Sequence, residues 1–149
     1  MRNITIVRRK YGLGGGCTLD VYAEERGTYD AVIDGVPCRY VGKLTDGGSL
    51  TFSIGENRTR IFVIQFLFSS FMHSEMTVIS AGSTDLTLTG KWSAMITIAT
   101  FFRFDQNDSE EARAYHKKLI RNNRLFILAV VGLIFSGCVV ALCRFFANR

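Results

Sequence analysis

The sequence predicts a mainly β protein, in which an antiparallel β-sandwich is followed by a C-terminal α-helix that spans a membrane. Residues 3–104 are short runs of β-branched and aromatic residues broken by Gly, Asp and Asn, with only one Pro in the chain, which is typical of strands and turns. Residues 125–143, LFILAVVGLIFSGCVVALC, carry no charge. A chain of 149 residues has room for one domain and a short appendage.

Eight or nine strands are expected in about a hundred residues, which suggests an antiparallel sandwich. SLTFSI alternates, so Leu50, Phe52 and Ile54 share one face, whereas RIFVIQF is apolar on both faces and indicates a central strand. Asp34-Gly35 and Asp46-Gly47 supply positive φ angles for tight connections. The expected strands are Ile4–Arg9, Thr18–Glu24, Tyr29–Ile33, Arg39–Leu44, Ser49–Ile54, Thr59–Phe66, Glu75–Ile79, Thr84–Leu88 and Ala94–Phe101.

The stretch YDAVIDGVPCRYVGKLTDGGSLTFSIGENRTRIFV, Tyr29 to Val63, resembles a PEGA-type module. Its pattern is a strand ending in Asp-Gly, then Val-Gly-Lys, an alternating apolar strand, a Gly turn and a β-branched strand. The resemblance implies a small β-sandwich of the kind found in bacterial proteins, often beside membrane helices, that binds or scaffolds and does not catalyse. The matching residues are Asp34, Gly35, Val41, Gly42, Lys43, Leu44, Leu50, Phe52, Ile54 and Gly55.

A basic helix is predicted between the β-sandwich, residues 1–107, and the apolar segment. Asp108 with Glu111 three residues later resembles a capping box, so a helix should begin at about Ser109. Ala112, Tyr115 and Leu119 then recur on one face. This stalk, residues 108–124, either runs unbroken into the membrane or bends at Asn122-Asn123.

The segment Leu125 to Cys143 is predicted to span the membrane, followed by a short tail, residues 144–149. Nineteen helical residues extend roughly 28 Å, close to the hydrocarbon thickness of a bilayer. Gly132 with Ser136, and Gly137 with Ala141, form small-xxx-small pairs that favour close helix contacts and would allow a homo-oligomer to form through the helix. A buried helix of a soluble domain is the alternative.

Charge flanking the segment predicts its orientation. Residues 1–112 carry eleven basic residues and all thirteen acidic ones, whereas 113–149 carry seven basic residues and no acid. Because basic residues resist translocation, the N-terminal domain should face the cytoplasm in a single-pass, tail-anchored arrangement. Sequons at Asn3, Asn57 and Asn107 leave the opposite topology open, since glycans there would place the domain outside. The basic residues expected near lipid headgroups are Lys117, Lys118, Arg121 and Arg124.

Two aromatic clusters, FLFSSFM and TFFRF, have two interpretations. They can rest on the lipid interface or dock a protein partner, or they can fill the core of the sandwich. The candidate interface residues are Phe66, Phe68, Phe71, Phe101, Phe102 and Phe104.

No enzymatic chemistry is expected. His73 and His116 are the two histidines, no cluster has the spacing of a metal site, and no nucleophile with a base stands out, so neither a metal nor a cofactor is expected. Basic residues outside the stalk are scattered among acids without interleaved aromatics, which is unlike a nucleic-acid surface.

The preferred hypothesis is a non-enzymatic binding or scaffold module that tethers a protein partner at the cytoplasmic membrane face. The first alternative is an oligomeric effector whose helices assemble into a pore when the β domain senses a signal. The second is a soluble β domain with a buried C-terminal helix.

Overall fold

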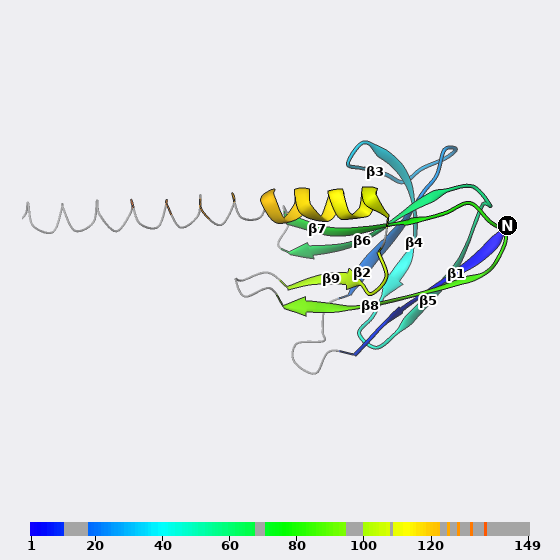
Figure 1. Ribbon diagram of the computed structural model, residues 1–149, viewed down its shortest axis with the longest axis horizontal. Helices are drawn as coiled ribbons and strands as arrows, with labels where there is room; N and C mark the ends of the chain where they lie inside the picture. The colour runs from blue at the N-terminus through cyan, green and yellow to red at the C-terminus, as the bar shows by residue number, and fades with distance from the viewer. Residues whose placement is uncertain are drawn as a thin grey trace, which may run out of the picture. The chain divides into compact units, whose positions relative to one another are not determined.

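The computed structural model contains two β-sheets that pack against each other, with a helix beginning against one of them (Figure 1). The chain divides into two units, Met1–His116 and Lys117–Arg149; the first is called the β domain below. The sequence placed this boundary at residue 107, before the helix. The structure describes residues 1–10, 18–67, 71–94, 100–107 and 109–122, and single positions at 125, 128, 132 and 136.

Nine strands and one helix make up the regular structure of the described residues. The helix covers residues 110–122. The strands are β1 (Arg2–Arg8), β2 (Leu19–Glu24), β3 (Ala31–Ile33), β4 (Val36–Leu44), β5 (Ser49–Ile54), β6 (Thr59–Leu67), β7 (Phe71–Ile79), β8 (Leu86–Ala94) and β9 (Thr100–Phe104).

The strands form a four-stranded sheet in the order β5-β1-β8-β9 and a five-stranded sheet in the order β3-β4-β2-β6-β7. The prediction of a mainly β fold with two sheets is confirmed. One pair departs from the expected antiparallel arrangement, because β1 and β8 run parallel, with Ile4 opposite Leu86 and Ile6 opposite Leu88. A parallel pair needs a long crossover, and here the whole five-stranded sheet lies between β1 and β8 in the sequence.

The main core lies between the two sheets. It takes Ile4 and Ile6 from β1, and Phe102 and Phe104 from β9, with further apolar residues of β2, β5 and β6, all buried. The Phe102 and Phe104 rings meet edge to face, with centroids 5.1 Å apart. A β carbon at Gly90 on β8 would collide with the Phe102 ring, so glycine lets the ring lie directly on the neighbouring strand.

A smaller core covers the outer face of the five-stranded sheet. Phe62 and Ile64 of β6 meet Met76 of β7 there, under Ala112 and Tyr115 of the helix. The helix begins as expected, although its capping residue is Ser109, whose Oγ accepts a hydrogen bond from the Ala112 N–H at 3.1 Å. The predicted apolar face is confirmed for Ala112 and Tyr115. β6 lies between β2 and β7 and is an interior strand with two buried faces, as the sequence indicated.

The tight connection at Asp34-Gly35 forms as predicted. Ile33 pairs with Val36 across it, and φ is +52° at Asp34 and +82° at Gly35, the signature of a two-residue hairpin turn. Gly47 also has a positive φ of +70°, in a turn where the Gly48 N–H donates to the Thr45 carbonyl at 3.1 Å.

Arg8 is a charged residue inside the sandwich, with a fully buried side chain. Its guanidinium donates to the Leu44 carbonyl at 3.4 Å and lies 3.4 Å from an Asp46 carboxylate oxygen. A buried cation needs a paired anion and hydrogen bonds to offset its desolvation. Arg8 therefore ties the end of β1 to the connection between β4 and β5.

Candidate functional site

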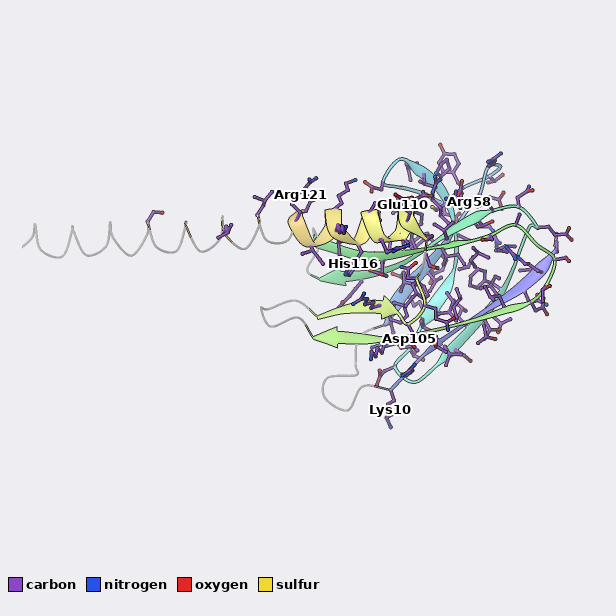
Figure 2. The ribbon with its side chains drawn as sticks, viewed as in Figure 1. Lys10, Arg58, Asp105, Glu110, His116 and Arg121 are labelled. Carbon is purple, nitrogen blue, oxygen red and sulfur yellow. The ribbon has the colours of Figure 1, made fainter. Side chains whose placement is uncertain are left out.

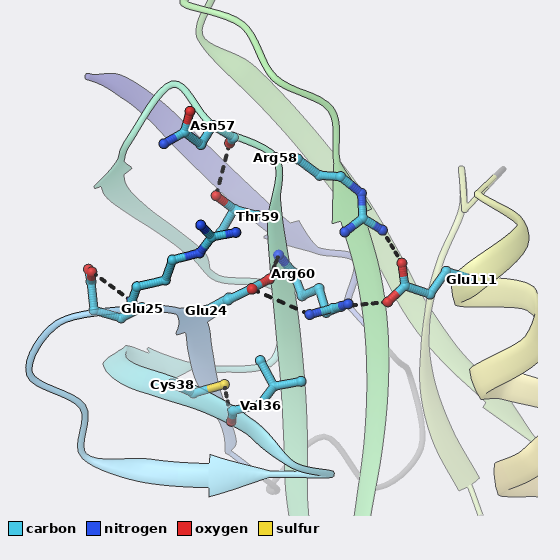
Figure 3. Close-up of polar contacts among 10 residues, drawn as sticks. Glu24, Glu25, Val36, Cys38, Asn57, Arg58, Thr59, Arg60 and Glu111 are labelled. Atoms are coloured by element: carbon cyan, nitrogen blue, oxygen red, sulfur yellow. Dashed lines mark hydrogen bonds and ion pairs between the residues drawn. The ribbon is translucent and has the colours of Figure 1, made fainter.

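A network of carboxylates and guanidinium groups joins the start of the helix to the five-stranded sheet. The Glu111 carboxylate accepts hydrogen bonds from both Arg58 and Arg60. Arg60 also lies 3.3 Å from Glu24 of β2, which accepts the Arg60 backbone N–H at 3.1 Å. Figure 3 shows Arg60 between the two carboxylates, with Arg58 reaching Glu111 from the preceding turn.

The pKa shifts in this network follow from its geometry. Partial burial alone would raise the pKa of Glu111, but hydrogen bonds from Arg60 and Arg58 outweigh it and leave that pKa below its usual value. The hydrogen bond to Glu111 likewise raises the pKa of Arg60. The Glu111 carboxylate and the Arg60 guanidinium therefore stabilise each other's charged form, and their contact holds the start of the helix against the five-stranded sheet.

A second polar cluster lies where the chain leaves β9 for the helix. The Glu75 carboxylate of β7 is 3.0 Å from Nδ1 of His116 and accepts a hydrogen bond from the Asn107 amide at 3.2 Å. The same Asn107 amide donates to the Met76 carbonyl at 2.8 Å. Figure 2 shows His116 pointing from the helix toward the strands. The Asn107 side chain thus makes two hydrogen bonds within the fold, whereas the sequence indicated Asn107 only as part of a sequon.

Burial dominates the electrostatics of Glu75. Its side chain is 4% exposed, and desolvation raises its pKa, although His116, Asn107 and the charge of Arg103 each act to lower it. A carboxylate paired with an imidazole resembles half of an acid–base site. This carboxylate has almost no exposed surface from which to meet a substrate, so we interpret the pair as a structural contact.

A cleft of about 150 Å³ lies at one end of the sandwich and is called the Arg39 cleft below. Arg39 of β4 is 3.8 Å from Glu25 and donates to the Ser53 carbonyl at 3.1 Å. Arg26 and Arg58 also line the cleft. Guanidinium groups around a hollow can bind an anion, and two of these three, Arg26 and Arg39, are not paired with Glu111. The remaining lining residues are Ala23, Glu24, Glu25, Ile54, Gly55, Asn57 and Thr59.

For two of the six aromatic residues the interface interpretation is wrong and the alternative, a place in the core of the sandwich, is confirmed. Phe102 and Phe104 are 4% and 2% exposed and belong to the main core, because β9 turns both rings toward the opposite sheet. Phe66, Phe71 and Phe101 lie in β6, β7 and β9, but their side chains are outside the described part of the structure, as is all of Phe68.

The residues predicted to meet the membrane lie in the second unit. Lys117, Lys118 and Arg121 are exposed on the helix, and Leu125, Gly132 and Ser136 are exposed helical positions. Within the described residues, no helix combines the length and the apolar character needed to cross a membrane. The other predicted positions, Arg124, Gly137, Ala141 and Cys143, lie outside the described residues.

Cys38 does not have the character of a reactive thiol. It is buried in the smaller core, and its Sγ donates to the Val36 carbonyl at 3.3 Å. Desolvation, followed by the charge of Glu24, raises the pKa of this thiol to about 11, whereas a nucleophilic cysteine needs a lowered one. Among the residues that the structure describes, no group of three His, Cys, Asp or Glu side chains could hold a metal ion.

The sequence does not match any protein-family model, and no curated protein matches it significantly. The resemblance of residues 29–63 to PEGA-type modules therefore remains a prediction. Tyr29 to Val63 covers β3, β4, β5 and the first half of β6, which lie in both sheets. The module-like stretch is thus built into a larger sandwich.

The polar groups that define the site were missed at the sequence level. Arg58 and Arg60 stand two apart in NRTRI, a spacing that places both side chains on one side of an extended chain and that could have indicated a basic pair. Their partner Glu111 is more than fifty residues away. Such a pairing cannot be found without the topology.

Proposed function

We propose that this protein is a non-enzymatic membrane-anchored binding module, whose β domain tethers a protein partner at the cytoplasmic face. Holding both molecules at one surface raises their effective concentration. The basic residues that precede the apolar segment set this orientation. The resemblance to PEGA-type modules supports binding as the role of the β domain.

The observation that carries the proposal is the uncharged segment from Leu125 to Cys143. In a domain of this size a helix without a polar face is seldom surrounded on all sides. Arg121 and Lys118 precede the segment and Arg144 follows it, so charges bracket the apolar stretch as they do in membrane anchors. Of its described side chains, Leu125 and Leu128 are 61% and 68% exposed.

The composition of the two cores supports an anchor over a buried C-terminal helix. Every described residue of either core lies between Ile4 and Tyr115. In the part of the chain that the structure describes, the β domain therefore builds both cores from its own residues. A further helix is not required to cover either sheet face that these cores occupy.

Carbonate extraction tests the anchor. The full-length chain should stay in the membrane pellet and be released only by detergent, whereas residues 1–122 should appear in the supernatant as a folded domain. The fragment ends after Asn122 because a cut at 107 would remove Ala112 and Tyr115 and uncover Phe62. Release of the full-length chain by carbonate would reject the proposal.

A pore is the second candidate function, favoured by the two small-xxx-small pairs of the apolar segment, Gly132 with Ser136 and Gly137 with Ala141. Purified protein in liposomes distinguishes the two functions. A passive tether leaves the membrane sealed, whereas an assembled pore gives discrete conductance steps that a Gly132→Leu variant should abolish.

A further inference from the structure

The Arg39 cleft is bounded by structural elements of both sheets. The end of β2, the turn that follows it and Arg39 of β4 form one side. The end of β5 and the turn into β6 form the other. Its 150 Å³ is far more than the space that one water requires, so a side chain fits.

The charges lining the cleft favour an anionic guest. Glu24 is engaged by Arg60, and one oxygen of Glu25 accepts the backbone N–H groups of Arg26 and Gly27, at 3.1 and 3.4 Å. Both carboxylates are thus partly neutralised by the protein itself. Within the described part of the chain, the Arg26 guanidinium has no ion-pair or hydrogen-bond partner. Among the residues that the structure describes, Arg39 contacts the Ser53 carbonyl and, at 3.8 Å, Glu25, which leaves donors on its planar group for a carboxylate.

The rest of the cleft favours a peptide over a free ion. Ala23 and Ile54, both buried, give it an apolar floor. β5 is an edge strand of its sheet, and its Ser53 carbonyl is turned toward Arg39, so main-chain groups lie beside the cationic groups. An extended peptide uses such an edge for hydrogen bonds and a neighbouring pocket for a side chain.

We propose that the Arg39 cleft binds the carboxylate side chain of an acidic, extended peptide segment of the partner, with Arg26 and Arg39 as its ligands. This inference rests on the proposed function, because it assigns the partner-binding surface of the tether. Arg58 is committed to Glu111 and adds only to the local positive potential.

The test is a titration of the isotope-labelled full-length chain in detergent micelles, followed by NMR. The probe is an acetylated and amidated peptide of alternating valine and glutamate; its glutamine isostere is the matched ligand control. The glutamate peptide should shift the Ser53 and Gly55 amides saturably, and the isostere should not. The Arg26→Gln/Arg39→Gln variant should weaken binding by about tenfold or more, the loss expected for charged hydrogen bonds.

The protein control is Lys43→Gln/Lys91→Gln, which removes two exposed positive charges away from the cleft and should leave the affinity unchanged. If both double variants lost affinity for the glutamate peptide equally, the effect would come from net charge alone, and the proposal would be overturned. So would shifts produced by inorganic phosphate and not by the peptide, or no shift with either. The titration is carried out in micelles, so its result does not depend on the outcome of carbonate extraction. The proposed peptide site and the proposed membrane anchor can therefore be rejected separately.

Discussion

The two faces of β6 carry similar buried side chains, but they pack against different elements. On the inner face, Ile61 and Val63 pack against a second sheet that supplies large apolar residues. On the outer face, Phe62 and Ile64 are covered in part by the first turns of the helix, which contribute Ala112 and Tyr115. Ion pairs of Glu111 and the Glu75–His116 contact hold that helix. Packing on the inner face is thus stabilised by apolar burial. The helix that packs on the outer face is held in part by charged groups, whose interactions change with salt and pH.

The largest expected effect is on the inner face, at Phe104. Phe104→Ala should lower the free energy of unfolding of residues 1–122 by about 3 to 5 kcal/mol, because it removes a fully buried ring and leaves a cavity. Urea denaturation followed by circular dichroism measures the loss. Phe104→Leu, which retains much of the volume, should cost clearly less. Similar small losses in both variants would show that β9 does not close the main core.

On the outer face, Tyr115→Ala should cost about 1 to 2 kcal/mol. Tyr115 is half-buried and packs edge to face on Phe62, with ring centroids 5.9 Å apart, a pair worth about 1 kcal/mol beyond its area. Hydrogen exchange should show faster exchange at amides 113–116 and unchanged protection in β1. Tyr115→Phe, which keeps the ring, is the control. Loss of protection in both regions together would show that the two faces unfold as one unit.

Glu111→Gln should cost about 1 kcal/mol or less, since Glu111 and Arg58 are 37% and 48% exposed and water screens their interaction. The folded state lowers the pKa of Glu111, so its contribution is present above the ordinary carboxyl pKa of 4.5 and disappears as pH falls through the folded value. Urea titrations at pH 7 and pH 3, in low and high salt, measure it.

The matched control is Glu110→Gln, on the neighbouring and exposed position of the same helical turn. Both variants remove a negative charge near the helix N-terminus, so the difference between them isolates the contacts with Arg58 and Arg60. No difference at pH 7 would mean that these ion pairs do not hold the helix.

Local patterns in the sequence predicted much of the β domain. The alternation in SLTFSI predicted the bounds of β5 as the structure has them, and RIFVIQF, apolar on both faces, predicted that β6 is an interior strand. Expected strands at Thr84–Leu88 and Ala94–Phe101 were displaced from β8 and β9. Gly90 interrupts the apolar pattern of β8, and a glycine within a strand normally counts against it. It is tolerated here because the Phe102 ring occupies the space of its side chain.

The polar contacts could not be predicted, for a different reason. Glu75, Asn107 and His116 come from a strand, a connection and a helix, and nothing in their spacing links them. The parallel pairing of β1 with β8 is equally non-local. Periodicity reports which face of an element is buried, but contacts between distant elements depend on the topology, which periodicity leaves open.

The smallest expected effect is a change in the pH dependence of stability at Glu75. It distinguishes the Glu75–His116 contact from the ion pairs of Glu111. Burial raises the pKa of Glu75, so its protonated form favours the folded state. Stability due to this group is fully present below pH 4.5, the ordinary value, and is lost as pH rises through the folded pKa. Above pH 4.5 the free energy of unfolding should fall with pH less steeply in Glu75→Gln than in wild type. The difference in slope should be a fraction of about 1.4 kcal/mol per pH unit, which is the slope that one full proton produces.

The groups that face Glu75 define the control. The charges of His116 and Arg103, and hydrogen bonds from His116 and Asn107, all lower its pKa. His116→Gln keeps a polar side chain opposite Glu75 but removes the imidazole, so the pKa of Glu75 should rise further and the loss of stability should extend to higher pH. Denaturant midpoints from pH 4 to pH 8 compare the three proteins. A His116→Gln profile that coincides with that of Glu75→Gln would show that the buried carboxylate does not set the pH response of the helix contact.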